Sequence, residues 1–313
     1  MTDASDGELL NRGYSYWSQA FVQGDDVLCF VGHRDGAPRF FRVNLRSRSV
    51  ERLGPLLGLL GTGEGMYFGA DGWVSRTVGP RLVRMNPLTS ESRVVFDISE
   101  CADYQNHRIW QAHSSDDRLT HSATIQEIMD VGPYLNIGTI AVRLGQQSVF
   151  FPAHGSLDES QITSDGAFLV IKENEDNVII DMSDGSSARI TDANGAFGHS
   201  DCGPSFIIGE TDKPDPGRCA MLDFRTGERR DLFFTTRMGH VSVRAGRCLL
   251  SDETHLSLVV LDGSGITPIL AHGMISDGTY DTQVFGNLDP AGRVAAYVSN
   301  AAGRFDLYLA ELP

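Results

Sequence analysis

The chain has 313 residues, 34 of them glycine, and a formal net charge of −15 at pH 7. This excess of acid excludes a nucleic-acid-binding protein, because contact with a phosphate backbone requires a cationic face. The glycine content favours many tight turns, and an all-β domain of this length can bury a large core.

The N-terminal segment, residues 1–16, has no basic region followed by an apolar run. No apolar stretch reaches the ~20 residues that a membrane helix needs, so the sequence predicts no membrane association. The five cysteines are odd in number, and three of them lie in apolar strand-like runs. We therefore expect buried thiols and a cytoplasmic protein.

A repeated phrase organises the chain: an alternating apolar strand, an anchor residue, a short turn and a second strand. Anchors without an intervening weaker copy lie 42, 42 and 39 residues apart, which matches the ~40–45 residue period of a propeller blade. One of the seven copies, that at residue 143, is weaker, and the closing segment supplies the last copy near residue 310. The anchors in chain order are Asn44, Asn86, Arg143, Asp181, Asp223, Asp262 and Ala310.

These copies predict an all-β fold, a seven-bladed β-propeller of four-stranded antiparallel blades that forms one domain over residues 1–313. The last blade has only about three strands before Pro313, so the segment before Trp17 is expected to supply its outer strand. Helical periodicity occurs only at residues 124–131, within an insertion of the third blade at 121–137.

Polar residues stand where the innermost strands are expected to begin, facing the central channel, and small-molecule sites favour such a concave face. Each of them could instead satisfy a nearby backbone group. Two of them, His199 and His240, follow glycine and lie 41 residues apart, which favours convergence in neighbouring blades, although the blade repeat alone would also explain them. The full set is Gln19, Glu64, Gln111, His113, Gln161, His199, His240 and Gln283.

Other polar residues receive a plainer interpretation. His255 and His272 fall at loop-like positions and are expected to face solvent. Of the 26 basic residues only Lys172 and Lys213 are lysines. This bias reflects either coding preference or a need for arginine, which binds carboxylates in bidentate fashion.

The strand phrases "SDGAFLVIK" and "DPAGRVAAYVSNAAGRFDLYLAEL" and the blade openings "GHSD" and "GHVS" resemble the cytoplasmic oligogalacturonate lyases and, more broadly, TolB-type (PD40) propellers. As motif the resemblance covers residues 196–300. The prolyl oligopeptidases share such propellers, but no Gly-x-Ser-x-Gly elbow is present, which disfavours a peptidase.

The resemblance implies a divalent metal, manganese or calcium, held by His240 and Gln283, with His199 as the catalytic histidine. Substrate contacts are expected from Gln19, Gln111, His113 and Gln161. The chain departs from the family after Gln283, where Gly286, Asn287 and Leu288 stand in place of further ligands. Either His199 completes the metal site or no metal is bound.

Three functions remain open on the sequence. The first is an oligouronide lyase, which would cleave its substrate by metal- or arginine-assisted β-elimination. The second is a propeller without chemistry that binds a ligand or serves as a scaffold. The third is a lyase or cyclase of specialised metabolism that uses His199 and His240. In each case the expected partner is a small molecule or an oligosaccharide.

Overall fold

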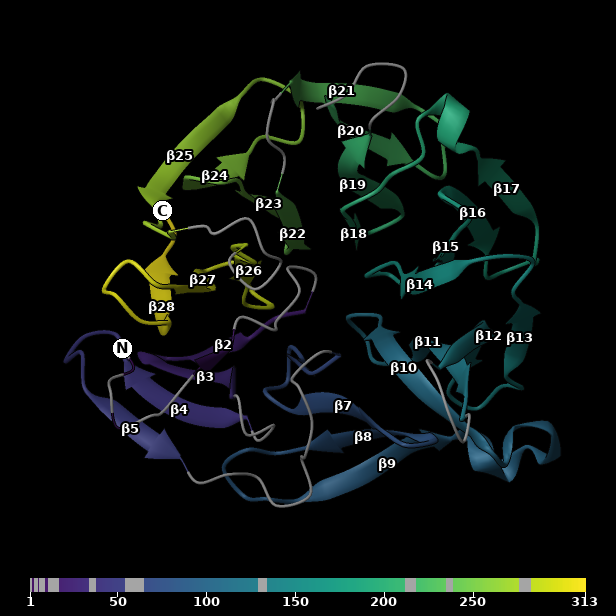
Figure 1. Cartoon of the computed structure of the whole chain (residues 1–313), viewed down its shortest axis with the longest axis horizontal. Helices are drawn as coiled ribbons and strands as arrows, with labels where there is room; N and C mark the ends of the chain where they lie inside the picture. The colour runs from purple at the N-terminus through teal and green to yellow at the C-terminus, as the bar shows by residue number, and fades with distance from the viewer. Residues whose placement is uncertain are drawn as a thin grey trace.

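The computed structural model describes residues 2, 5, 9–10, 17–33, 38–53, 65–128, 134–211, 218–234, 239–275 and 283–313. Seven antiparallel sheets form a ring, and each sheet runs outward from the ring axis (Figure 1). The predicted seven-bladed propeller is therefore confirmed. No described helix is both long enough and apolar enough to span a membrane.

In each blade the strands follow one another from the ring axis outward. The first has β2 (Ala20–Gln23), β3 (Asp26–His33), β4 (Arg39–Asn44) and β5 (Val50–Leu53), and the second has β6 (Tyr67–Phe68), β7 (Val74–Val78), β8 (Arg81–Met85) and β9 (Ser92–Asp97). The third has β10 (His107–Ser114), β11 (Thr120–Glu127), β12 (Leu135–Arg143) and β13 (Val149–Pro152). The fourth has β14 (Leu157–Ile162), β15 (Phe168–Glu173), β16 (Asp176–Asp181) and β17 (Ser187–Ile190).

The remaining blades follow the same order. The fifth has β18 (Ser200–Gly203), β19 (Phe206–Thr211), β20 (Arg218–Asp223) and β21 (Arg229–Phe234). The sixth has β22 (His240–Arg244), β23 (Arg247–Ser251), β24 (His255–Val259) and β25 (Ile266–Ala271). The seventh has β26 (Asn287–Leu288), β27 (Val294–Ser299) and β28 (Asp306–Glu311).

Five of the seven anchor residues, those that are Asn or Asp, cap the turn between the third and fourth strands of their blade. The Asn44 side-chain oxygen accepts a hydrogen bond from the Ser47 amide at 2.8 Å, and Asp181 accepts one from the Ser183 amide at 2.8 Å. Asn and Asp favour such turns because a short side chain can bond to the backbone two or three residues on. The sequence repeat that predicts the fold thus reflects a turn-capping hydrogen bond that recurs from blade to blade.

The apolar core lies between neighbouring blades. One cluster joins Val27 and Val43 of the first blade to Val294 and Leu307 of the last, and these two blades lie side by side in Figure 1. Each sheet buries both faces in this way, so the strands need not alternate strictly between apolar and polar residues. All five cysteines are free thiols, and four of them are buried, as expected.

The ring closes at the N-terminal segment. The Thr2 hydroxyl donates to Asp306 at 2.7 Å and accepts from the Leu307 amide at 3.0 Å, both on β28. The short strand β1 (Leu9–Leu10) pairs instead with β3 of the first blade. In the described residues the last sheet has three strands, and the N-terminal segment contacts the blades on both sides of the seam.

The helix expected at residues 124–131 is wrong, because residues 120–127 form the strand β11. This strand pairs with β10 on one side and β12 on the other, and its first seven residues are buried. A strand that is buried on both faces loses the period of two, which allowed the helical interpretation. Part of the extra length of this blade lies in three strands of 8, 8 and 9 residues.

Candidate functional site

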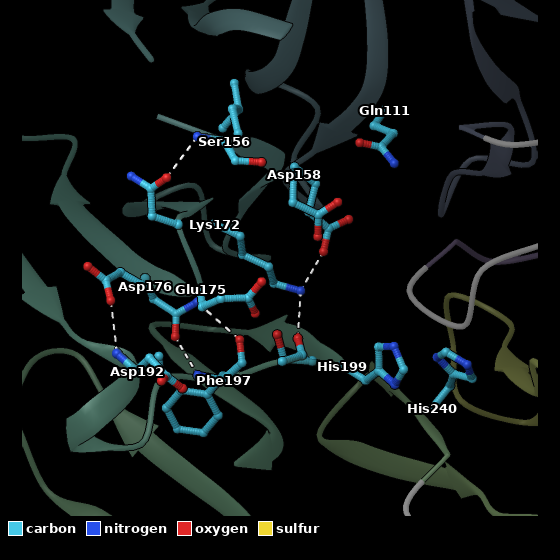
Figure 2. A pocket seen from close by; sticks show the side chains of 17 residues that line it. Gln111, Ser156, Asp158, Lys172, Glu175, Asp176, Asp192, Phe197, His199 and His240 are labelled. Atoms are coloured by element: carbon cyan, nitrogen blue, oxygen red, sulfur yellow. Dashed lines mark hydrogen bonds and ion pairs between the residues drawn. The ribbon is translucent and has the colours of Figure 1, made fainter. Parts of the chain in front are cut away.

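A cavity of about 450 Å³ opens where the inner strands of the fourth, fifth and sixth blades begin (Figure 2). It extends from the axial end of β22 across the contact between the fourth and fifth blades. Its lining is polar. Its lining includes the side chains of Gln111, Asp158, Glu159, Lys172, His199 and His240.

The two histidines that follow glycine lie side by side at one end of this cavity (Figure 2). His199 directly precedes β18, and His240 is the first residue of β22, so the two side chains occupy equivalent places in neighbouring blades. Their ring centroids are 4.4 Å apart. Gln283 joins them, because its Oε1 lies 3.1 Å from His240 Nε2. The structure thus brings together His199, His240 and Gln283.

The two imidazoles differ in environment. His240 is 2% exposed, and desolvation, followed by the influence of His199, lowers its pKa to about 3. It is therefore neutral at pH 7. The His199 side chain is 43% exposed, and its Nδ1 lies 3.8 Å from the carboxylate oxygen Oε2 of Glu210 on β19. A carboxylate beside one ring nitrogen favours proton uptake at the other, so His199 is the better candidate base.

Lys172 of β15 places a charge inside the cavity wall. Its Nζ donates to Glu159 Oε1 at 2.5 Å and to the carbonyl oxygen of Gly198 at 2.9 Å. Burial alone would lower the lysine pKa, but the neighbouring Glu159 carboxylate outweighs it and the pKa is raised. The lysine is therefore protonated, and it anchors the backbone residue that precedes His199.

Gln111 is the one predicted substrate-contact residue that lines this cavity. It adopts a φ of +47°, within the irregularity of β10 between Trp110 and His113. Its Oε1 is buried and accepts no hydrogen bond from the described residues. A ligand hydroxyl or amide would satisfy this acceptor.

Gln19, His113 and Gln161 do not gather at the cavity. His113 and Gln161 lie within strands rather than at their starts, because β10 and β14 begin several residues earlier than expected. The Gln161 amide donates to Glu159 at 3.0 Å and to the Ser200 carbonyl oxygen at 3.1 Å. The His113 ring packs against Trp17 at 5.5 Å.

Gln19 is tied to the start of the last blade. Its Oε1 accepts from Asn287 Nδ2 at 3.0 Å, and its backbone amide donates to Asn287 Oδ1 at 2.8 Å. This pair joins the first and seventh blades. Glu64, the remaining member of the predicted set, lies outside the described residues.

The expectation that His272 faces solvent is wrong. It is 3% exposed, its Nε2 donates to the Asp252 carbonyl oxygen at 2.9 Å, and its Nδ1 accepts from the Met274 amide at 3.1 Å. Both ring nitrogens are satisfied, as in a core histidine. It therefore belongs to the framework of the sixth blade.

The described residues around His240 do not fit the divalent metal that the family resemblance implies. His240 Nε2 and Gln283 Oε1 lie 3.1 Å apart and offer two protein atoms, fewer than the three or more that usually hold a metal. Asn287 is bonded to Gln19, and Gly286 and Leu288 carry no ligand atom. No group of three or more His, Cys, Asp or Glu side chains in the described ranges could hold a metal ion.

The charges of the site come from residues that the sequence did not single out. Glu159, Lys172 and Glu210 lie within strands, and the rarity of lysine in this chain was the only sequence signal for any of them. None of the described cavity-lining residues is an arginine, so the arginine-rich composition does not serve this site. Arginines pair with acids elsewhere, for example Arg244 with Asp201 at 2.9 Å.

Fold and site together define a seven-bladed propeller with a histidine pair at an acidic cavity. No protein-family model matches the sequence, and no curated protein matches it. A solved oligogalacturonate lyase from Vibrio parahaemolyticus is similar in structure, with a TM-score of 0.71, 12% identity, and coverage of 98% of this chain and 92% of the lyase. An oligogalacturonate lyase in complex with manganese has a TM-score of 0.72, 16% identity, and coverage of 97% and 90%.

A puromycin hydrolase is also similar in structure, with a TM-score of 0.61, 12% identity, and coverage of 97% of this chain and 55% of the hydrolase. At these low sequence identities the comparisons show that the fold is shared, and they do not show the activity of this chain. They confirm the architectural resemblance to oligogalacturonate lyases that the strand phrases and the "GH" openings indicate.

The buried histidines make the protein sensitive to acid. Desolvation lowers the pKa of His113 and His240 to about 3 and that of His121 to about 4. Between pH 6.5 and pH 4 the unfolded chain therefore binds protons that the folded chain does not, and stability falls as the pH falls. We expect a slope of about 1.4 kcal/mol per pH unit for each histidine near pH 5.

Urea unfolding at a series of pH values from 7 to 5 measures this slope. The variant His240→Gln should reduce it near pH 5 by about 1.4 kcal/mol per pH unit, the contribution of one histidine. A free energy of unfolding that stays constant over this range would contradict the assignment of neutral, buried imidazoles.

Proposed function

We propose that this propeller is a lyase that cleaves a uronic-acid oligosaccharide by β-elimination, with His199 as the base and without a resident metal. The observation that carries the proposal is the position of the His199 ring. It lines the cavity, its Nδ1 lies 3.8 Å from the Glu210 carboxylate, and its centroid lies 4.4 Å from that of the neutral His240 ring. The structural similarity to oligogalacturonate lyases supports the same class of reaction.

In this reaction His199 removes the proton from the carbon next to the uronic carboxyl group. The electron pair of that C–H bond forms a double bond to the neighbouring ring carbon, whose bond to the glycosidic oxygen breaks. The leaving oxygen takes a proton from solvent or from the protonated imidazole. Products are an unsaturated uronide and a shortened sugar chain, and no oxidant or reductant is consumed.

The surrounding residues have supporting roles in this scheme. The Glu210 carboxylate stabilises the imidazolium that forms as the proton is taken up. Lys172 holds the Gly198 carbonyl oxygen and so fixes the backbone from which His199 projects. Gln111 offers a buried acceptor for a sugar hydroxyl at the opposite wall (Figure 2).

The test is an elimination assay that records the ultraviolet absorbance of the unsaturated uronide from a panel of oligouronides that differ in length and esterification. We expect product to form at the same rate before and after treatment with a metal chelator, because the proposed proton transfer uses protein groups alone. Loss of activity on chelation, restored by manganese, would contradict the metal-free mechanism. Binding without product would instead identify a ligand-binding propeller.

A further inference from the structure

The cavity around His199 has an excess of negative charge. Its described lining contains five carboxyl groups, one lysine, Lys172, and no arginine; the acids are Asp158, Glu159, Glu175, Asp176 and Asp192. Of these, Asp176 is paired with Arg189 outside the lining, at 2.9 Å. Lys172 is already bonded to Glu159, so its charge is matched within the wall. No basic side chain of the described residues lies within ion-pair distance of Asp158 or Glu175.

A free uronate is poorly suited to such a place. Its carboxylate would approach Asp158 and Glu175 in a partly enclosed space, where like charges repel more strongly than in water. Removal of the neighbouring proton would add a second negative charge to the same group. Enzymes normally stabilise that charge with a cation, and the one cation in the described lining is held by Glu159 and Gly198.

An ester or amide of the uronic acid avoids both the repulsion by the cavity carboxylates and the second negative charge on deprotonation. The proton next to an ester or amide is more acidic than the proton next to a carboxylate, because the resulting enolate carries one negative charge rather than two. Such an enolate can be stabilised by hydrogen bonds alone. Asp158 projects into the cavity, where its carboxylate would repel a free uronate but not an ester or amide.

We propose that the cavity accepts a uronide whose carboxyl group is uncharged, as an ester or amide, and discriminates against free uronates. This inference rests on the proposed function and narrows its substrate class. The unsatisfied Oε1 of Gln111 provides a separate contact for a neutral sugar hydroxyl. The charge of the cavity, rather than its shape, then selects the substrate.

The first experiment compares fully methyl-esterified and de-esterified oligogalacturonides of equal length in the elimination assay. We expect kcat/KM to be at least ten times higher for the ester. Asp158→Asn should reduce this preference severalfold by improving the reaction of the free acid, whereas the remote, exposed control Asp184→Asn should leave it unchanged. Equal or faster cleavage of the free acid by the unmodified protein would overturn the inference but not the proposed lyase activity.

The second experiment measures binding by calorimetry with His199→Ala, so that binding is observed without turnover. Tighter binding of the ester than of the acid, in the absence of any elimination by the unmodified protein, would support the charge selection and refute the lyase. Binding of neither would refute both. A glucosamine oligomer that binds more tightly than the ester would identify a site for amines and overturn the inference.

Discussion

His199→Ala is expected to lower kcat for elimination by about 10²- to 10⁴-fold, the range attributed to a positioned general base. The free energy of unfolding should change little, because the imidazole is 43% exposed and lies at the end of a strand. Kinetics at saturating substrate and urea unfolding of the same preparation measure the two effects separately. The large loss of activity at nearly constant stability is what distinguishes a base from a structural histidine.

His154→Ala is the matched control for this variant. His154 is exposed and does not line the His199 cavity, so both activity and stability should stay at the level of the unmodified protein. Glu210→Gln should retain the fold and lose a smaller share of activity, because the imidazolium would lose its neighbouring charge but not its position. If His199→Ala kept activity within a factor of two, the base would have to be another residue.

Lys172→Met is expected to destabilise the protein by about 3–5 kcal/mol, the usual cost of leaving a buried charge without its partner. The side chains of Lys172 and Glu159 are 10% and 4% exposed, and their contact is 2.5 Å. Without the lysine, Glu159 would stay ionised in a poorly solvated wall or become protonated. Urea unfolding at pH 7 measures the loss.

The double variant Glu159→Gln with Lys172→Met should recover most of that stability, because it removes both charges and leaves no unpaired ion. Glu159→Gln alone should be destabilised in the same way as Lys172→Met. As a control, Arg230→Met breaks the exposed ion pair with Glu228 and should leave unfolding unchanged. Independent, additive effects of the two buried substitutions would show that the pair is not coupled.

The architecture follows from the sequence because it depends on local, repeated features. Residues such as Asn44 and Asp181 recur with the blade period since each caps its own turn, and that hydrogen bond involves only a few neighbouring residues. His199 and His240 converge for the same reason: the repeat places their strands at equivalent positions in adjacent blades. Turn caps and equivalent strand positions can therefore be predicted from the spacing of residues in the sequence, because they do not depend on contacts between distant segments.

The tertiary structure alone decided which side chains meet across blades. The Lys172 bond to Gly198, the Glu210 carboxylate beside His199 and the burial of His272 arise from contacts that no period in the sequence specifies. The strand at residues 120–127 likewise became recognisable only through its pairing on both sides. Spacing determines where a strand turns, but the charge and protonation of a site depend on packing between strands that are distant in the chain.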